Sequence, residues 1–308
     1  MNLRQNESKR IVHAPAKLNL FLDVFGRHSD GYHELATLMV PIRLYDSLSF
    51  EPTPATASRP GPIEFLLRGG DSAKEVPADS SNLVVRALEL LRRRSGCELG
   101  AKVELFKRIP SGAGLGGGSS DASAALRLAS RGWRIHWGPE KLASLAAELG
   151  SDVPFFLEPG AAICRGRGER VERLGATVPL DVAILKPPAA LATADVYSAL
   201  DRLGGGSERP ALHRERSLAA LTDALRRGTI QNLGEWMGNR LQAAAASLSP
   251  WIDRVRAVFA ELDFLGHQLS GSGSAYFGVC RHARHARRLA TILKMRQLGH
   301  VYVIRSGN

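Results

Sequence analysis

A glycine-rich stretch, IPSGAGLGGGSSDASAAL at residues 109–126, is the clearest candidate for chemistry in this sequence. Five of the seven residues from Gly112 to Gly118 are glycine. Glycine lacks a Cβ and is entropically costly to order, so such a run indicates that something approaches the backbone closely. An alternating segment at 101–107 precedes the run and an alanine-rich helical pattern follows it. A loop that leads into a helix N-terminus presents unpaired N–H groups and a positive dipole end, which favour a phosphate.

Two common phosphate motifs do not fit this stretch. The P-loop ends in GK[ST], whereas this loop ends in GGGSSD and contains no lysine. GxGxxG occurs at Gly112, Gly114 and Gly117, but a dinucleotide fold also needs a buried first strand and an acid about twenty positions later. The preceding strand alternates with charged residues and residues 131–137 contain no acid, so this match is interpreted as accidental.

Three charged residues are candidates to act beside a bound phosphate. Asp152 precedes the apolar run VPFF, where partial burial would make its carboxylate a better proton acceptor, although a helix-cap or turn role is an alternative. In KLNLFLDV, period-2 alternation puts Lys17 and Asn19 on the face opposite the core, where a solvated lysine is the simplest expectation. Asp121, early in the predicted helix, would repel a bound phosphate unless it points away or holds Mg²⁺.

Two pairs of residues could contact a second ligand or could simply pack. Tyr32 and His33 follow an Asp-Gly turn, where an aromatic residue and a histidine often form a packed corner. Thr193 could cap a helix, and Tyr197 would then be a half-buried aromatic on it.

Composition narrows the class of protein without deciding its partner. The net charge of +11 and the pI near 10.1 are compatible with nucleic acid, an acidic small substrate or an arginine-rich surface. The basic segment at 281–288 is expected to be the solvated face of a helix whose Leu289, Ile292 and Leu293 face inward. His282 and His285 have no cysteine or acid nearby in sequence, so no metal site is expected there.

Cysteine usage and hydropathy predict a cytoplasmic protein. Cys97, Cys164 and Cys280 are far apart and show no CxxC spacing, which suits a reducing compartment. No run of eighteen apolar residues exists, and the N-terminus is polar and charged, so neither a membrane span nor an export signal is expected.

The chain of 308 residues exceeds the usual size of a single core and is predicted to form two α+β domains, 1–160 and 161–308. Alternating patterns predict strands within 10–50 and at 101–107, and further strands are expected at 63–69 and 182–186. Helices are expected from a cap at Ser80 or Ser81 to Gly96, from a cap at Ser119 or Ser120, and from Pro139 to Gly150. A second glycine-rich turn is expected at 269–278, then a helix and a strand, and loops at 51–62 and 204–210.

The string PSGAGLGGGSSDASAA resembles the PxxxGLGSSAA motif of the GHMP kinases. APAKLNLFLDVFGRHSDGYHEL and LSGSGSAYFG are similar to the first and third motifs of that superfamily. AKLNL, DGYHEL, GLGGGSSDA and SDVPFF together resemble its branch that phosphorylates a cytidylated methylerythritol. The resemblance implies a two-domain GHMP kinase fold: an N-terminal mixed α/β domain with the phosphate-binding loop and a C-terminal ferredoxin-like α+β domain.

The resemblance also implies roles for individual residues. Asp152 would be the catalytic base, with Lys17 as its cationic partner. Asn19, Tyr32, His33, Thr193 and Tyr197 would bind the substrate, with Tyr32 and Tyr197 stacking on cytosine and His33 bonding its edge; this chain has Tyr197 where Phe is also seen. The loop that would bind ATP comprises Pro110, Ser111, Gly112, Ala113, Gly114, Leu115, Gly116, Gly117, Gly118, Ser119 and Ser120.

ATP and Mg²⁺ are the implied cofactors, and the ligands of the metal are not assigned. The implied reaction is ATP-dependent phosphorylation of the 2-hydroxyl of 4-diphosphocytidyl-2-C-methyl-D-erythritol, in the non-mevalonate route to isoprenoid precursors. A homoserine- or mevalonate-type kinase and a noncatalytic nucleotide- or RNA-binding module are the alternatives. The implied partners are ATP and a cytidine-diphosphate-linked small molecule, with no nucleic acid and no membrane; the sequence predicts no oligomeric state.

Overall fold

A computed structural model describes residues 10–27, 31–55, 60–204 and 211–307. The predicted turn at 29–33 and the predicted loops at 51–62 and 204–210 lie partly outside these residues. The chain forms two compact units built from interleaved segments. The first unit comprises Met1–Ala16, Leu44–Ser111 and Gly117–Glu158, and the second comprises Lys17–Arg43, Gly112–Gly116 and Pro159–Asn308.

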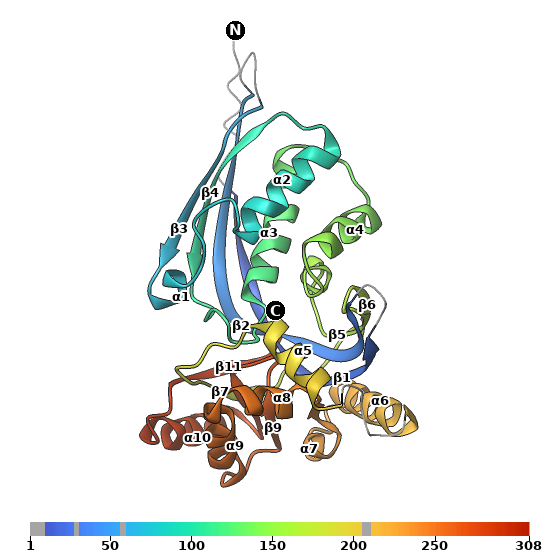
Figure 1. The fold of residues 1–308 in the computed structure, drawn as a ribbon, viewed down its shortest axis with the longest axis vertical. Coiled ribbons are helices and arrows are strands. Elements are labelled where there is room, and N and C mark those ends of the chain that lie inside the picture. Colours follow the sequence, from blue (N-terminus) through green and yellow to red (C-terminus); the bar gives the residue numbers. More distant parts are fainter. Residues whose placement is uncertain (1–9, 28–30, 56–59, 205–210, 308) are drawn as a thin grey trace. The chain divides into compact units, whose positions relative to one another are not determined.

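The first unit packs helices against a sheet (Figure 1). Strand β2 (His33–Thr53) pairs antiparallel with β4 (Gly100–Lys107) through its C-terminal part, and β4 pairs in parallel with β3 (Ile63–Gly69). The first residues of β1 (Arg10–Arg27) complete the order β3-β4-β2-β1. The helices are α1 (Asp71–Lys74), α2 (Leu83–Ser95), α3 (Gly117–Gly132), α4 (Pro139–Leu149) and the 3-10 turn η1 (Pro154–Leu157).

The core of the first unit follows the alternation of its strands. Ala101, Val103 and Leu105 of β4 are buried, and Leu88 and Leu91 of α2 pack in the same core. The predicted face of each element is therefore confirmed. Each buried leucine stabilises this unit by about 1.5–3 kcal/mol relative to its exposed state.

Two predicted helix caps are wrong. The N-cap of α2 is Asn82, whose side chain accepts a 2.9 Å hydrogen bond from the Val84 N–H, and not Ser80 or Ser81. Gly96 ends α2 with φ of 71°, as predicted. Helix α3 begins at Gly117, so Ser119 and Ser120 lie inside its first turn.

The second unit contains a four-stranded antiparallel sheet in the order β11-β7-β10-β9. Its strands are β7 (Asp181–Lys186), β9 (Gly266–Leu269), β10 (Tyr276–Cys280) and β11 (His300–Arg305). Taken with α5 (Thr193–Arg202) and α10 (Ala283–Met295), they run strand–helix–strand–strand–helix–strand, with further helices between α5 and β9. This is the connectivity of a ferredoxin-like fold and confirms that prediction.

The second unit also contains strands of the other, seven-stranded sheet and further helices (Figure 1). The N-terminal part of β2 pairs with β5 (Ala162–Gly166), which pairs with β6 (Arg170–Arg173), and β1 pairs with β8 (Gly238–Asn239). The other helices are α6 (Ala211–Arg227), α7 (Leu233–Trp236), α8 (Leu241–Leu248) and α9 (Pro250–Ala260). Helix α10 carries the basic segment outward and buries Leu289 and Leu293, as predicted.

The cysteines and the hydropathy of the helices can be described for the residues that the structure covers. Cys97, Cys164 and Cys280 are free thiols, and Cys164 and Cys280 are buried. No helix among the described residues is long and apolar enough to cross a bilayer.

Candidate active site

Lys17 and Asn19 are buried, so the expectation that this face of β1 is exposed to solvent is wrong. Lys17 is 3% exposed and Asn19 is 2% exposed. Lys17 Nζ donates to Asn19 Oδ1 at 2.6 Å, and Asn19 Nδ2 donates to Thr37 Oγ1 at 2.8 Å. Gln268, far along the chain, donates from Nε2 to the Asn19 carbonyl at 2.7 Å. A buried ammonium held in such a chain of hydrogen bonds has a fixed position, which suits a functional cation.

The centre of the glycine loop is held by the second glycine-rich turn. The Ser274 N–H donates to the Gly112 carbonyl at 3.2 Å, and the Ala275 N–H donates to the Ala113 carbonyl at 3.1 Å. Ser270 Oγ donates to the Gly114 carbonyl at 3.0 Å. Two sequence motifs 150 or more residues apart therefore form one backbone assembly.

Gly114 and Gly271 are needed where this assembly meets Lys17. Gly114 has φ of +71°, and a Cβ there would lie 2.0 Å from the Ser270 carbonyl oxygen. A Cβ on Gly271 would lie 3.2 Å from Lys17 Nζ, and the Lys17 N–H donates to the Leu115 carbonyl at 2.9 Å. At Gly114 the close approach inferred from the sequence is thus made by the chain's own backbone.

The two ends of the glycine loop belong to the first unit. Pro110 and Ser111 follow β4, and Gly117 to Ser120 form the start of α3. A Cβ on Gly118 would make only ordinary contact, 3.4 Å from Leu83 Cδ1. The start of α3 thus offers the helix N-terminus expected for a phosphate.

The carboxylate of Asp121 is buried and paired with a lysine. Its side chain is buried, and its Oδ2 accepts a 2.7 Å hydrogen bond from Lys107 Nζ. Lys107 also donates to Asp46, so these three charges form a buried cluster. Of the two possibilities open for Asp121, the structure supports a carboxylate that is turned into the protein.

Asp152 lies in the turn between α4 and η1 in the first unit. It is half-buried, and Val153, Pro154 and Phe155 after it are buried. The residue at the N-cap of η1 is Val153, so Asp152 does not occupy that cap. Because η1 packs on α3, the turn that carries Asp152 is anchored to the helix that begins at the glycine loop.

The residues predicted to bind cytosine partly converge in the second unit. The rings of His33 and Tyr197 lie 4.9 Å apart at 32°. His33 Nε2 donates to Asp201 Oδ1 at 2.7 Å, and Asp201 was not predicted. Tyr32 is 52% exposed, with the Arg167 guanidinium 4.5 Å from its ring, so it is not a packed corner.

Asp201 could have been found from helical spacing. It lies four residues after Tyr197 on α5, and residues four apart share one helix face. Thr193 begins α5 but is not its N-cap, which is Ala192; its Oγ1 lies 3.0 Å from Ser272 Oγ in the second glycine-rich turn.

Among the described residues, no group of three or more His, Cys, Asp or Glu side chains could hold a metal ion. His282 caps α10, and His285 Nε2 lies 3.2 Å from Asp263 Oδ1, so both histidines have contacts within the protein.

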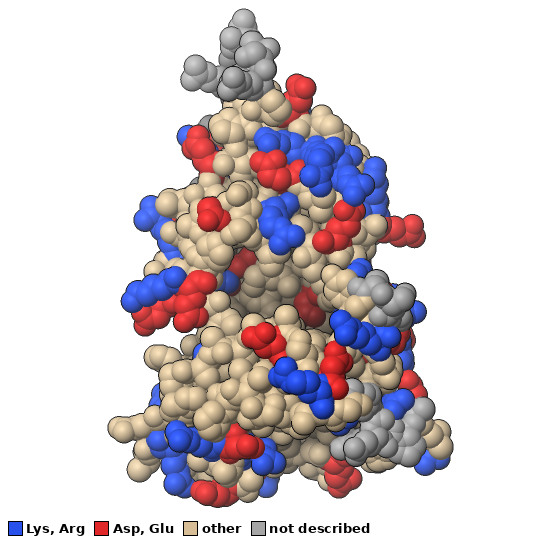
Figure 2. Space-filling model, viewed as in Figure 1, with Lys and Arg blue, Asp and Glu red and all other residues tan. Residues whose placement is uncertain are grey.

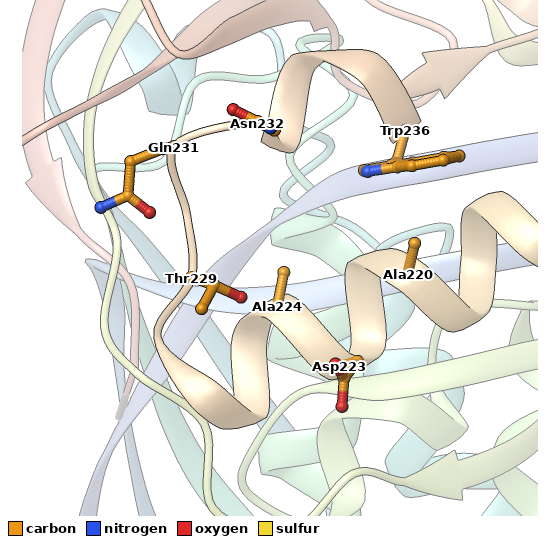
Figure 3. A pocket seen from close by; sticks show the side chains of 7 residues that line it. All are labelled: Ala220, Asp223, Ala224, Thr229, Gln231, Asn232 and Trp236. Carbon is orange, nitrogen blue, oxygen red and sulfur yellow. The ribbon is translucent and has the colours of Figure 1, made fainter.

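A surface pocket between α6 and α7 in the second unit is unrelated to the predicted site (Figure 3). Trp236 of α7 extends over it, while the side chains of Thr229, Gln231 and Asn232 come from the intervening loop. None of the predicted catalytic, ATP-binding or substrate-binding residues lines it.

Family matches define the class of protein. Residues 82–160 match the family described as GHMP kinases N terminal domain, and residues 221–296 match GHMP kinases C terminal. The chain is a GHMP kinase, with the predicted fold. Solved structures of a homoserine kinase from Cytophaga hutchinsonii (TM-score 0.74, 19% identity, 99% of this chain and 96% of that one) and of L. major mevalonate kinase (TM-score 0.73, 15% identity, 97% of each chain) share this fold.

More similar relatives define the branch. The chain is 40% identical over 278 residues to 4-diphosphocytidyl-2-C-methyl-D-erythritol kinase of Pelotomaculum thermopropionicum, which covers 90% of this chain and 91% of that one. It is 36% identical over 295 residues to the enzyme of that name from Exiguobacterium sibiricum, covering 96% and 97%. A crystal structure of 4-(cytidine 5'-diphospho)-2C-methyl-D-erythritol kinase has a TM-score of 0.76 at 36% identity, covering 97% of this chain and 100% of that one. The chain belongs to the 4-diphosphocytidyl-2-C-methyl-D-erythritol kinase family.

Proposed function

We propose that this protein transfers the γ-phosphoryl group of ATP to the 2-hydroxyl of 4-diphosphocytidyl-2-C-methyl-D-erythritol. It is an ATP-dependent small-molecule kinase of the isoprenoid precursor pathway that its family serves. The observation that carries the proposal is 40% identity over 90% of the chain to a kinase of this name. Homoserine and mevalonate kinases share the fold at 19% and 15% identity, which supports the fold and not their substrates.

In the proposed reaction, Asp152 accepts the proton of the substrate 2-hydroxyl as that oxygen bonds to the γ-phosphorus and ADP leaves. Proton transfer by a positioned carboxylate contributes about 10²- to 10⁴-fold in rate. The half-buried Asp152, fixed by the buried residues after it, supports this role.

Lys17 is proposed to offset negative charge on the migrating phosphoryl group. Phosphoryl transfer depends mainly on positioning and on neutralising charge, and the glycine loop has no lysine of its own. Burial of Lys17 and its 2.6 Å bond to Asn19 support a fixed cation rather than a solvated one. Asn19 would act by holding Lys17 as well as by contacting substrate.

ATP phosphates are proposed to bind the N–H groups at the start of α3, with Mg²⁺ carried on the phosphates. Magnesium usually keeps several waters and takes one or two carboxylates plus substrate phosphates, so it needs no cluster of protein ligands. Bound Mg²⁺ would neutralise phosphate charge during transfer. The protein residues that contact it are not assigned.

Cytosine is proposed to stack on Tyr32 and Tyr197 and to bond His33, with Thr193 beside it. The exposed Tyr32 ring and the pairing of His33 with Tyr197 support an aromatic site for a base. A cytoplasmic location is also proposed, in keeping with three free thiols.

The deciding experiment measures ATP consumption with the cytidylated methylerythritol, mevalonate and homoserine supplied separately. Turnover with the cytidylated substrate alone is expected. Turnover with mevalonate or homoserine instead would identify another GHMP kinase, and absence of turnover with a steep salt dependence of RNA affinity would identify a binding module.

A further inference from the structure

A buried charge cluster lies under the start of α3. Lys107 Nζ donates to Asp46 Oδ2 at 2.5 Å and to Asp121 Oδ2 at 2.7 Å. The three side chains are at most 3% exposed. Asp46 Oδ1 also accepts from the N–H groups of Arg108 and Ile109, at 2.5 and 2.9 Å. The cluster therefore ties β2 to the end of β4 and to α3, and β4 and α3 are the segments on either side of the glycine loop.

The cluster is also in close contact with the turn that begins α3. A Cβ on Gly117 would lie 3.2 Å from Lys107 Nζ and 3.0 Å from Ile109 Cγ2. Lys107 Nζ therefore lies close to the backbone of Gly117, at the helix N-terminus that is proposed to bind phosphate.

The charges of this cluster do not balance when both carboxylates are ionised. One ammonium faces two carboxylates, which leaves one excess negative charge in a buried place. Asp121 Oδ1 is buried and has no hydrogen-bond partner among the described residues. Burying an uncompensated charge is costly, so a proton on Asp121 would relieve the imbalance.

The surroundings of Asp121 favour its protonated form. Burial raises the pKa of Asp121 to about 7; Lys107 opposes the rise and Asp46 adds to it. Helices α2 and α4 and the turn η1 also pack on α3, but the charges that act most strongly on this carboxyl are those of Lys107 and Asp46. Lys107 itself stays charged, because its two carboxylate partners raise its pKa by more than burial lowers it.

We propose that Asp46, Lys107 and Asp121 form a proton-linked anchor of the glycine loop, in which Asp121 takes a proton from solvent as nucleotide phosphates bind at the start of α3. The cluster carries one excess negative charge beneath the start of α3, and a bound phosphate adds further negative charge there. A proton on Asp121 removes the excess charge of the cluster. These three are positioning residues, since they act through the backbone of α3. The inference rests on the proposed role of the loop in binding ATP.

Proton uptake can be measured directly by calorimetry. A nonhydrolysable ATP analogue with Mg²⁺ would be titrated into the full chain at pH 7.5, in buffers of different ionisation enthalpy. We expect the wild type to take up a fraction of a proton more than Asp121→Asn, since titration of the nucleotide itself is common to both. Across pH 7 to 9 the wild-type affinity should fall, by at most about tenfold per pH unit, relative to Asp121→Asn.

The control is Asp253→Asn, the same change at an exposed aspartate that pairs with Arg256 on α9. It should behave as the wild type does. Equal proton uptake and equal pH dependence in wild type and Asp121→Asn would overturn the inference. Failure of the wild type to bind the analogue at all would instead contradict the proposed function.

Infrared difference spectroscopy of the wild type keeps the inference testable if Asp121→Asn does not fold. Addition of the analogue should produce the C=O band of a newly protonated carboxylic acid at pH 7.5. Binding of the analogue without that band would show that no carboxyl gains a proton, and the inference would be wrong.

Discussion

Asp152 and Lys17 are the residues on which the proposed phosphoryl transfer depends most directly. Asp152→Asn keeps the shape of the side chain but cannot accept a proton, so kcat should fall by about 10²- to 10⁴-fold with little change in substrate binding. Lys17→Met should also act mainly on kcat, because the charge matters most as the phosphoryl group moves.

The double variant tests whether these two residues act as one unit. Its loss should be much smaller than the product of the single losses. Steady-state kinetics and thermal melts on the same samples separate catalysis from folding. A folded Asp152→Asn enzyme with wild-type turnover would eliminate the aspartate as the base.

Recognition of cytosine should be separable from recognition of ATP. Asp201→Asn replaces the charged acceptor of the 2.7 Å hydrogen bond from His33 with a neutral amide oxygen. It should raise the substrate KM by roughly tenfold, which is the difference between a hydrogen bond to a charged group and one to a neutral group. His33→Ala should raise it further. ATP affinity should stay constant in both, and Asp223→Asn, on the exposed face of α6, should match the wild type. Equal losses for ATP and substrate would indicate a structural role for His33.

Asp121 should make the stability of the fold depend on pH. Its pKa is raised from 3.8 to about 7 in the folded protein, chiefly by burial. Between these values the folded protein keeps a proton that the unfolded chain has lost, so this contribution to stability falls as pH rises. The Tm of Asp121→Asn minus that of the wild type should therefore rise from about pH 4 to 7 and then level off. A constant difference would mean that Asp121 titrates normally.

At the scale of elements, the glycine loop needs glycine for two different reasons. At Gly118 the proposed reason is the approach of phosphate, and at Gly114 it is the approach of the Ser270 backbone. Two substitutions test these reasons separately. Gly118 lies early in α3, at a position that accommodates a Cβ. In Gly118→Ala the free energy of unfolding should therefore stay the same or rise by up to about 1 kcal/mol, while ATP affinity falls. Gly114→Ala puts a Cβ 2.0 Å from the Ser270 carbonyl oxygen at a positive φ, so stability should fall. Thermal melts and calorimetry with ATP measure both quantities. Unchanged ATP affinity in Gly118→Ala would remove this turn from the nucleotide site.

At the scale of the whole molecule, a net charge of +11 should favour anionic substrates. Many arginines are locally paired, as in Arg94 with Glu148 and Arg281 and Arg288 with Asp263. Figure 2 shows Lys and Arg gathered over α2, whose last turn carries three arginines. The excess should still attract ATP and a diphosphate, so kcat/KM should fall as salt rises while kcat changes little. A value of kcat/KM independent of salt would show that this charge does not act on association.

Local sequence patterns were enough to predict many of the strands and helices of this protein and the place of its glycine loop. Alternation predicted β4, apolar residues three or four apart predicted α2 and α10, and the glycine run predicted a strand-to-helix loop, because each depends on residues close in sequence. The predicted N-cap of α2 was wrong by one or two residues. Asn82 and the serines before it are equally able to cap a helix, and only the backbone geometry selects among them.

Burial and long-range partners were decided only by the tertiary structure. Period-2 alternation marked Lys17 and Asn19 as a polar face, but Gln268 and the second glycine-rich turn cover them from more than 240 residues away. Asp121 with Lys107 and Asp46, and His33 with Asp201, are likewise brought together by β pairing and helix packing. A sequence pattern shows which residues share a face of one element, whereas their partners depend on which distant element the folded chain packs against that face.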